Sequence, residues 1–167
     1  PCAPAPEPLP EPPPDDSALP PGFAEEQTVR IQHAMIAQCE RRRDRVALLD
    51  APGGLNPIQA SAYADDKKLR GRGGMWAGLY YPWLSVPDPL LAEGLNRSIP
   101  PCGYAAGTLA QNDRTFGVRK PPANLPLEMV SEPVEPIDDQ TQERNDEAGV
   151  NAIRTFPGRG IRVWGAR

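Results

Sequence analysis

The stretch "MWAGLYYPWLSVPDPLL", residues 75–91, is the most aromatic part of the chain. It holds two of the three Trp residues and two of the four Tyr residues. Pro82, Pro87 and Pro89 exclude a long helix here, because proline has no backbone N–H to donate and clashes with the preceding turn. The stretch therefore predicts either a core strand, which Pro82 interrupts or bends, or the lining of a binding surface. Its composition favours the core strand.

The segment before this stretch predicts a helix followed by a strand. Residues 23–43, "FAEEQTVRIQHAMIAQCERRR", begin with acidic and end with basic side chains, which suits both ends of the helix dipole. The run "VALLD", residues 46–50, then predicts a buried strand, most naturally a parallel one. Apolar positions at helical spacing form a broad face on the predicted helix: Val29, Ile31, Ala34, Met35, Ile36 and Cys39.

The rest of the chain alternates between helical and extended patterns. Residues 55–70 are weakly helical after Pro57, and residues 99–117 predict a second helix that begins at Pro100 and Pro101. The small face of this second helix should allow close packing: Ala105, Ala106, Leu109 and Ala110.

Residues 118–137 are rich in proline and extended, and "LEMV", residues 127–130, could form one short strand. Residues 138–149 predict a polar helix or turn. The strands "NAIRTF" and "IRVWGA" should then form a hairpin around Pro157 to Gly160. Together these elements predict an α/β layered domain with a mixed β-sheet flanked by helices.

The first 21 residues differ in composition from the remainder. Ten of them are proline, four are acidic (Glu7, Glu11, Asp15 and Asp16), and none is basic. We expect residues 1–21 to be an extended acidic arm or linker, and residues 22–167 to be the α/β domain.

The arm carries −4, which equals the net charge of the chain, so the domain is formally neutral with 18 basic and 18 acidic residues. A neutral domain lacks the electrostatic footprint of a nucleic-acid-binding protein, and the single basic run "KKLRGRGG", residues 67–74, is weak evidence for one.

The sequence contains no pattern typical of catalysis or of metal binding. Cys2, Cys39 and Cys102 are far apart and form no C-x-x-C pair, so we expect reduced thiols and no zinc or redox site. The one histidine, His33, lies inside the first predicted helix, and the carboxylate pairs Asp65–Asp66 and Asp138–Asp139 lie in polar segments. We therefore expect no catalytic, cofactor-binding or metal-binding residues, no cofactor, no small-molecule substrate and no enzyme.

Several blocks in a fixed order resemble the sheath proteins of contractile phage tails. They are "CERRRDRVALLDAPGG", "GLYYPWLSVPDP", "IPPCGYAAGTLAQNDRTFGVRKPPAN" and "GVNAIRTFPGRGIRVWGAR". The resemblance covers about residues 28–167 and extends to R-type bacteriocins and extracellular contractile injection systems. It implies a subtilisin-like α/β domain with a structural and non-enzymatic role. Members of this family continue past "WGAR", so we expect the domain to be incomplete at its C-terminus.

The resemblance also implies partners and a mechanism. Identical subunits would form stacked hexameric rings around an inner tube protein, with baseplate and cap proteins at the ends, in a particle assembled in the bacterial cytoplasm. Terminal arms would add strands to open sheet edges of neighbouring subunits, and rigid-body rearrangement would drive contraction. Two alternatives remain at this point: a proline-rich adaptor with a non-catalytic α/β body, and a hydrolase that shares the family's architecture.

Overall fold

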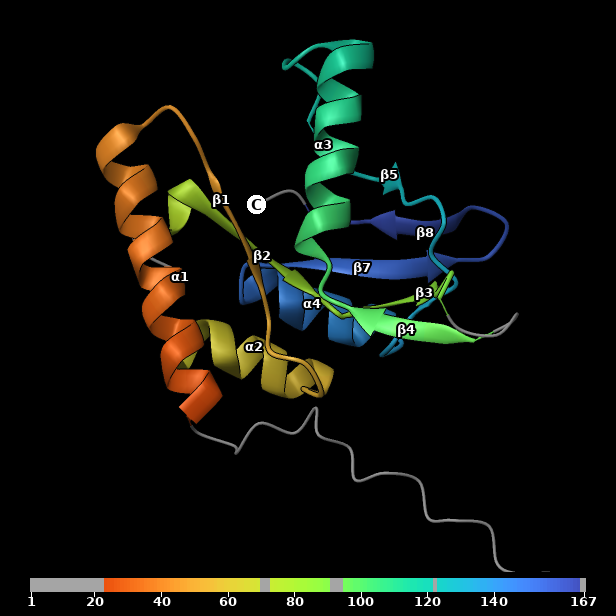
Figure 1. Ribbon diagram of the computed structural model, residues 1–167, viewed down its shortest axis with the longest axis horizontal. Helices are drawn as coiled ribbons and strands as arrows, with labels where there is room; N and C mark the ends of the chain where they lie inside the picture. The colour runs from red at the N-terminus through yellow and green to blue at the C-terminus, as the bar shows by residue number, and fades with distance from the viewer. Residues whose placement is uncertain (1–22, 70–72, 91–94, 122, 166–167) are drawn as a thin grey trace, which may run out of the picture.

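A five-stranded mixed β-sheet forms the centre of the computed structural model, which describes residues 23–69, 73–90, 95–121 and 123–165 (Figure 1). The first three strands run parallel and the last two join them antiparallel. The mixed sheet predicted from the sequence is therefore confirmed. In spatial order the strands are β1 (Ala47–Asp50), β2 (Ala77–Tyr81), β7 (Val150–Phe156), β8 (Gly160–Val163) and β5 (Leu125–Pro126).

Helices and a second, smaller sheet cover the two faces of this central sheet. One face packs against α1 (Phe23–Arg42) and α2 (Pro57–Asp66). Ile137 and Ala148, on either side of α4 (Asp139–Glu147), pack against the same face. The other face packs against α3 (Cys102–Phe116) and an antiparallel sheet of β4 (Asn96–Ile99), β3 (Leu84–Pro87) and β6 (Glu132–Pro133). A short 3-10 turn, η1 (Gly73–Trp76), precedes β2.

The aromatic stretch passes between the two sheets. Tyr80 and Tyr81 are adjacent in β2, so their side chains point to opposite faces, and both are buried. Tyr81 lies in the core beneath the three helices, and Tyr80 lies in the core beneath α3. Pro82 ends β2, and the chain continues at Leu84 into the smaller sheet. The core interpretation of this stretch is confirmed.

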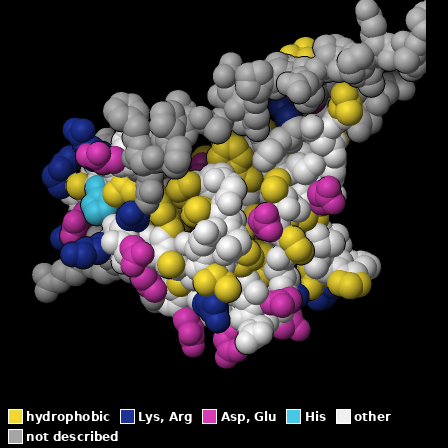
Figure 2. All heavy atoms as spheres, turned by 90° about the horizontal axis from the view of Figure 1, so that it is seen from below, with side chains coloured by type: hydrophobic (Ala, Val, Ile, Leu, Met, Phe, Trp, Pro, Cys, Tyr) yellow, Lys and Arg dark blue, Asp and Glu magenta, His cyan; other side chains and the backbone are white. Residues whose placement is uncertain are grey.

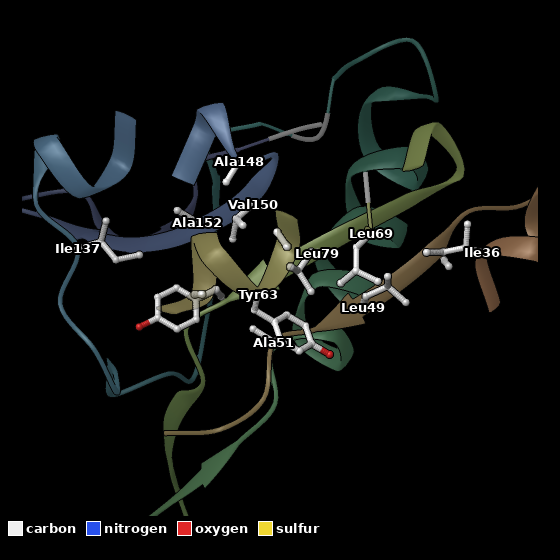
Figure 3. Packing of buried hydrophobic residues seen from close by; sticks show 14 of the residues in the cluster. Ile36, Leu49, Ala51, Tyr63, Leu69, Leu79, Ile137, Ala148, Val150 and Ala152 are labelled. Atoms are coloured by element: carbon white, nitrogen blue, oxygen red, sulfur yellow. The ribbon is translucent and has the colours of Figure 1, made fainter. Parts of the chain in front are cut away.

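The larger core lies between the central sheet and the helices α1, α2 and α4. Figure 3 shows Leu49, Leu79 and Val150 from three neighbouring strands, packed against Ile36 of α1 and Tyr63 of α2. At about 25 cal/mol per Å² of apolar surface removed from water, burial of this cluster is the main term that stabilises the domain.

Local sequence signals explain where two of the helices begin. Asn56 and Gln59 form a capping box at the start of α2, each side chain accepting a hydrogen bond from the other's backbone N–H at 2.9 Å. Asp138 caps α4 with its side chain, because its carboxylate accepts a hydrogen bond from the Thr141 N–H at 2.7 Å.

The structure differs from two of the helix-packing expectations. On α1 only Ile36 and Cys39 of the expected broad face are buried, whereas Ile31, Ala34 and Met35 are exposed. On α3 only Ala105 of the expected small face is buried, whereas Ala106 and Ala110 are exposed. Both helices flank β1, an edge strand, which offers each of them only a narrow strip to cover.

The expected strand at "LEMV" is wrong. Pairing occurs on either side of it, at Leu125–Pro126 and at Glu132–Pro133, and the backbone of Met129 adopts a positive φ of 60° that no strand contains. Leu127 is nevertheless held to the sheet, because its N–H donates to the Ile161 carbonyl at 2.9 Å. The other predicted elements, including the β7–β8 hairpin, are confirmed.

The predicted arm, residues 1–21, lies outside the described residues. Among the residues that are described, no helix has the length and apolar composition needed to span a bilayer.

Removing the Tyr81 ring should destabilise the domain strongly. The side chain is 2 % exposed, and its hydroxyl donates to the Leu55 carbonyl at 2.8 Å. We expect Tyr81→Ala to lower the free energy of unfolding by about 3–5 kcal/mol, as for other large aromatic residues in cores. Tyr81→Phe, which keeps the ring, should lose only about 1 kcal/mol. Urea titration followed by circular dichroism measures both, and equal losses for the two variants would contradict the packing described.

Candidate assembly surface

The two edges of the central sheet differ in their capacity to accept another strand. At the β5 edge, Leu125 and Leu127 direct their backbone groups towards β8, so Pro126 between them faces outward. Proline has no N–H to donate, and such a residue at an edge blocks further pairing. The β5 edge is therefore closed.

The β1 edge is open. Ala51 donates its N–H to the Tyr80 carbonyl at 3.2 Å, so the alternate residues Leu49 and Ala51 face β2. Leu48, between Ala47 and Leu49, must then direct its N–H and C=O away from the sheet. Neither group has a partner among the described residues. An unpaired backbone donor and acceptor in a strand edge form a template for a further strand.

An apolar groove of about 380 Å³ runs along this open edge between α1 and α3. We call it the edge groove. Val46 is 60 % exposed at its entrance, and Gly103 of α3 leaves one wall low enough for a backbone to approach closely. Its main lining residues are Met35 and Cys39 of α1, Val46 and Leu48 of the β1 segment, and Cys102, Gly103 and Ala106 of α3.

Gln32 closes the edge at the end of β1. Its side-chain amide donates to the Asp50 carbonyl at 2.8 Å, and its oxygen accepts from the Tyr63 hydroxyl at 2.8 Å. Gln32 is 4 % exposed, so both polar groups of a buried side chain are satisfied. The open part of the edge therefore extends from Val46 to Leu48.

Asp50 joins β1 to the beginning of α3. Its carboxylate accepts a hydrogen bond from the Cys102 backbone N–H at 2.7 Å, which satisfies one of the free N–H groups of the helix N-terminus. Burial raises the pKa of Asp50 above its usual range, more than this hydrogen bond lowers it. Burial, with the neighbouring Asp50, also raises the pKa of Cys102 to about 11, so Cys102 is a neutral thiol rather than a nucleophilic thiolate at neutral pH.

A cluster of arginines lies at the other end of the edge groove. We call it the arginine cluster: Arg41, Arg42, Arg43 and Arg45, all exposed. Asp44 pairs with two of its members, at 2.7 Å from Arg45 and 3.3 Å from Arg42. The hydrogen bond from Arg45 holds the pKa of Asp44 below its usual range. The cluster therefore keeps a net charge of +3, from four arginines and one aspartate, at the groove entrance.

Of the titratable residues considered in the sequence, His33 lies beside the end of α2 that carries Asp65–Asp66, and Asp138–Asp139 lie at the start of α4. His33 is exposed on α1, where it is the cyan side chain in Figure 2, and its Nε2 lies 2.8 Å from the Lys67 carbonyl oxygen. A carbonyl only accepts, so this nitrogen is the protonated one and donates. The pairs Asp65–Asp66 and Asp138–Asp139 are exposed at opposite helix ends. Within the described ranges no group of three or more His, Cys, Asp or Glu side chains converges on a possible metal position.

The edge groove is not predictable from the sequence. The run "VALLD" predicts a buried strand but does not show that β1 is the last strand of its sheet, because strand order depends on non-local pairing. One signal is present in the sequence: an arginine-rich segment, residues 41–45, directly precedes the apolar run that begins at Val46.

Comparisons with known proteins place this fold among contractile sheaths. The sequence profile of the phage tail sheath protein central domain matches residues 18–167. No curated protein sequence matches the chain significantly.

Three solved structures illustrate the likeness. A chain of the anti-feeding prophage (AFP) baseplate, 6-fold symmetrised, is 28 % identical with a TM-score of 0.65 over 86 % of this chain and 35 % of its own. The AFP helical sheath in the contracted state is 29 % identical with a TM-score of 0.63 over 83 % of this chain and 35 % of its own. The contracted sheath complex of PVC, an extracellular contractile injection system, is 33 % identical with a TM-score of 0.59 over 72 % of this chain and 32 % of its own. The chain thus spans about a third of the length of each of these relatives.

The raised pKa of Asp50 predicts how stability depends on pH. Because the folded state disfavours ionised Asp50, the stability associated with its neutral form is present below the unfolded pKa of about 3.9 and is lost as the pH rises through the folded pKa. Asp50→Asn keeps an oxygen that can accept from the Cys102 N–H and removes the buried charge. We expect this variant to unfold at a higher urea concentration than the wild type at pH 7, and the difference to vanish at pH 3. A constant difference at both pH values would contradict the burial argument.

Proposed function

This chain belongs to the phage tail sheath protein family, and we propose that it forms part of a structural subunit of a contractile tail sheath. The observation that carries the proposal is its likeness, across most of its length, to the contracted helical sheath of AFP and the contracted sheath complex of PVC. We further propose that the subunits stack as hexameric rings around an inner tube and that the sheath contracts to drive this tube through a target envelope.

Assembly would use the open edge of β1. A strand from the terminal arm of a neighbouring subunit would pair with the free N–H and C=O of Leu48, with its side chains between α1 and α3. Main-chain hydrogen bonds of this kind give affinity without a specific side-chain pocket. They also tie two subunits together through a terminal segment, so that the link persists while the rigid domains change their relative orientation.

Contraction needs no chemistry from this domain. In a rigid-body transition the free energy comes from the difference between two packings of the same subunits. The domain has two cores, one on each face of a shared sheet, which suits a body that moves as a unit. The likeness to structural sheath proteins supports a non-enzymatic role.

The proposed partners follow from this role. They are further copies of the same subunit, the inner tube protein, and the baseplate and cap proteins at the two ends. Assembly would take place in the cytoplasm of a bacterium, and the product would be a tail or a tail-like particle.

The native particle tests this function directly. The sedimentable fraction of the source cells should contain a polypeptide with this sequence, and electron microscopy should show it in rods with a helical surface lattice. Mass spectrometry of the rods identifies the polypeptide and its full length. Recovery of the polypeptide only as a soluble monomer, with rods absent from cells that express it, would refute the proposal.

A charge placed at the open edge should prevent assembly without unfolding the domain. Val46→Lys introduces an ammonium group at an exposed position of the edge groove, where a paired strand would desolvate it. We expect the yield of rods to fall at least about tenfold, which corresponds to about 1.4 kcal/mol per contact.

The matched control is Val118→Lys, because Val118 is also an exposed valine (87 %) but lies beyond the end of α3. It should assemble like the wild type. Both variants should keep the wild-type unfolding midpoint, since exposed substitutions usually change stability by less than about 0.5 kcal/mol. Equal rod yields for the two variants would exclude the β1 edge as the assembly site.

A further inference from the structure

The N-terminal segment has a proline pattern that restricts how it can pair. In residues 3–12, "APAPEPLPEP", every second residue is proline, from Pro4 to Pro12. In an extended strand, alternate residues direct their backbone groups to opposite edges. One edge of this segment would therefore present the N–H groups of Ala3, Ala5, Glu7, Leu9 and Glu11, and the other edge would present none. Such a segment can pair on one side only, which is the position that proline occupies in natural sheets.

The β1 edge offers the complementary groups. Leu48 presents an N–H and a C=O, with no partner among the described residues, at the bottom of an apolar groove. The walls contributed by Gly103 and Ala106 are low, so they leave room for a chain of alternating proline and small residues. A segment paired here would point its prolines outward and end the sheet, as Pro126 does at the β5 edge.

The segment can reach this groove from its own chain. Cys39 lines the groove beside Ala47, whereas Gln32 contacts Asp50, so α1 and β1 run antiparallel. The 20 residues of α1 span about 30 Å. Residues 13–22, which precede α1, span about 31 Å when extended. A chain that leaves the N-terminus of α1 and returns alongside the helix therefore delivers residues 3–12 to the groove, parallel to β1.

Charge complementarity favours the same location. The arm contains Glu7, Glu11 and two aspartates and no basic residue. Within the described part of the chain Arg41 and Arg43 form no ion pair, and Arg45 lines the groove. The acidic segment would thus meet the arginine cluster at the groove entrance, and salt would weaken the contact.

We propose that residues 3–12 occupy the edge groove of their own subunit before assembly and shield the open edge of β1. This inference rests on the proposed function, because it concerns the edge that a neighbouring subunit would use. A tethered segment acts at high effective concentration, so weak pairing is enough to cover the edge. The strand of a neighbour joins the sheet by displacing it, and a free subunit is prevented from pairing with a wrong edge.

Amide hydrogen exchange at Leu48 tests the inference in the full chain. Ala5→Pro with Leu9→Pro removes two N–H groups from the pairing edge and leaves the charge of the arm unchanged. We expect the Leu48 amide to exchange at least about tenfold faster in this double variant than in the wild type, measured by NMR. Pro6→Ala with Pro10→Ala, the matched control, adds N–H groups to the outer edge only and should keep the slow exchange. Equal exchange at Leu48 in all three proteins would overturn the inference.

Protein concentration separates pairing within one subunit from pairing between two. Protection at Leu48 that is independent of concentration supports the intramolecular contact, and protection that grows with concentration overturns it in favour of the arm of a second copy. Arg41→Glu with Arg43→Glu should also speed exchange at Leu48, since it reverses the charge that attracts the arm.

The amide-exchange experiment and the rod assay can fail independently of each other. Rods with a fast-exchanging Leu48 amide in the free subunit would refute the arm contact alone. A slow amide in a protein that never forms rods would refute the sheath role alone.

Discussion

Strand β2 is the element on which both layers of the domain pack. Its two tyrosines point to opposite faces, so one core is built around Tyr81 and the other around Tyr80. Pro82 has no N–H for the ladder and ends the strand, and the chain crosses at once into the smaller sheet. The Trp83 indole N–H donates to the Ala51 carbonyl at 2.9 Å and so fixes this crossing to the end of β1. The central sheet, the helices that cover it and the smaller sheet are therefore joined through β2 and the residues that directly follow it.

Much of this fold was predictable from local signals. The helix α1 has acidic and basic ends, the α2 start has an N-cap followed by proline, and the β7–β8 hairpin has glycines at 158 and 160, where φ is 69° and 73°. Each of these signals acts within a few residues. The failed strand at residues 127–130 shows the opposite case, because its neighbours pair with residues more than 30 positions away. Periodicity likewise showed that α1 has apolar residues on one side, but not that an edge strand would cover only Ile36 and Cys39 of them.

The candidate site was less predictable than the fold, for the same reason. An open edge is a property of strand order, and the apolar residues of β1 are of the same kind as those of a central strand. The closed β5 edge has a sequence signal, because Pro126 stands between two leucines. Whether Pro126 faces outward, however, depends on the register of β5 with β8. The basic residues at the end of α1 are typical of a helix C-terminus, and only the structure shows that Arg45, which follows them, lines a groove.

Polar contacts between the helices add specificity to this packing. Ser61 of α2 donates to the side-chain oxygen of Asn145 of α4 at 2.7 Å, and Asn145 is fully buried. This hydrogen bond forms in one arrangement of the two helices, and sliding one helix over the other would leave both oxygens buried without it, at a cost in free energy. In a sheath subunit such pairs would resist sliding of α2 over α4 while the whole body rotates.

One closed edge and one open edge give the central sheet a valency of one. A sheet with two open edges could add strands on both sides and grow into a fibre, whereas this sheet can accept a single strand at β1 and is then saturated. The strand order thereby limits the stoichiometry of strand addition: each domain can receive at most one donated segment through this sheet. In a lattice of such domains, the position of each donated segment would determine where the next subunit is added. An excess of donated segments could not add further strands to this sheet.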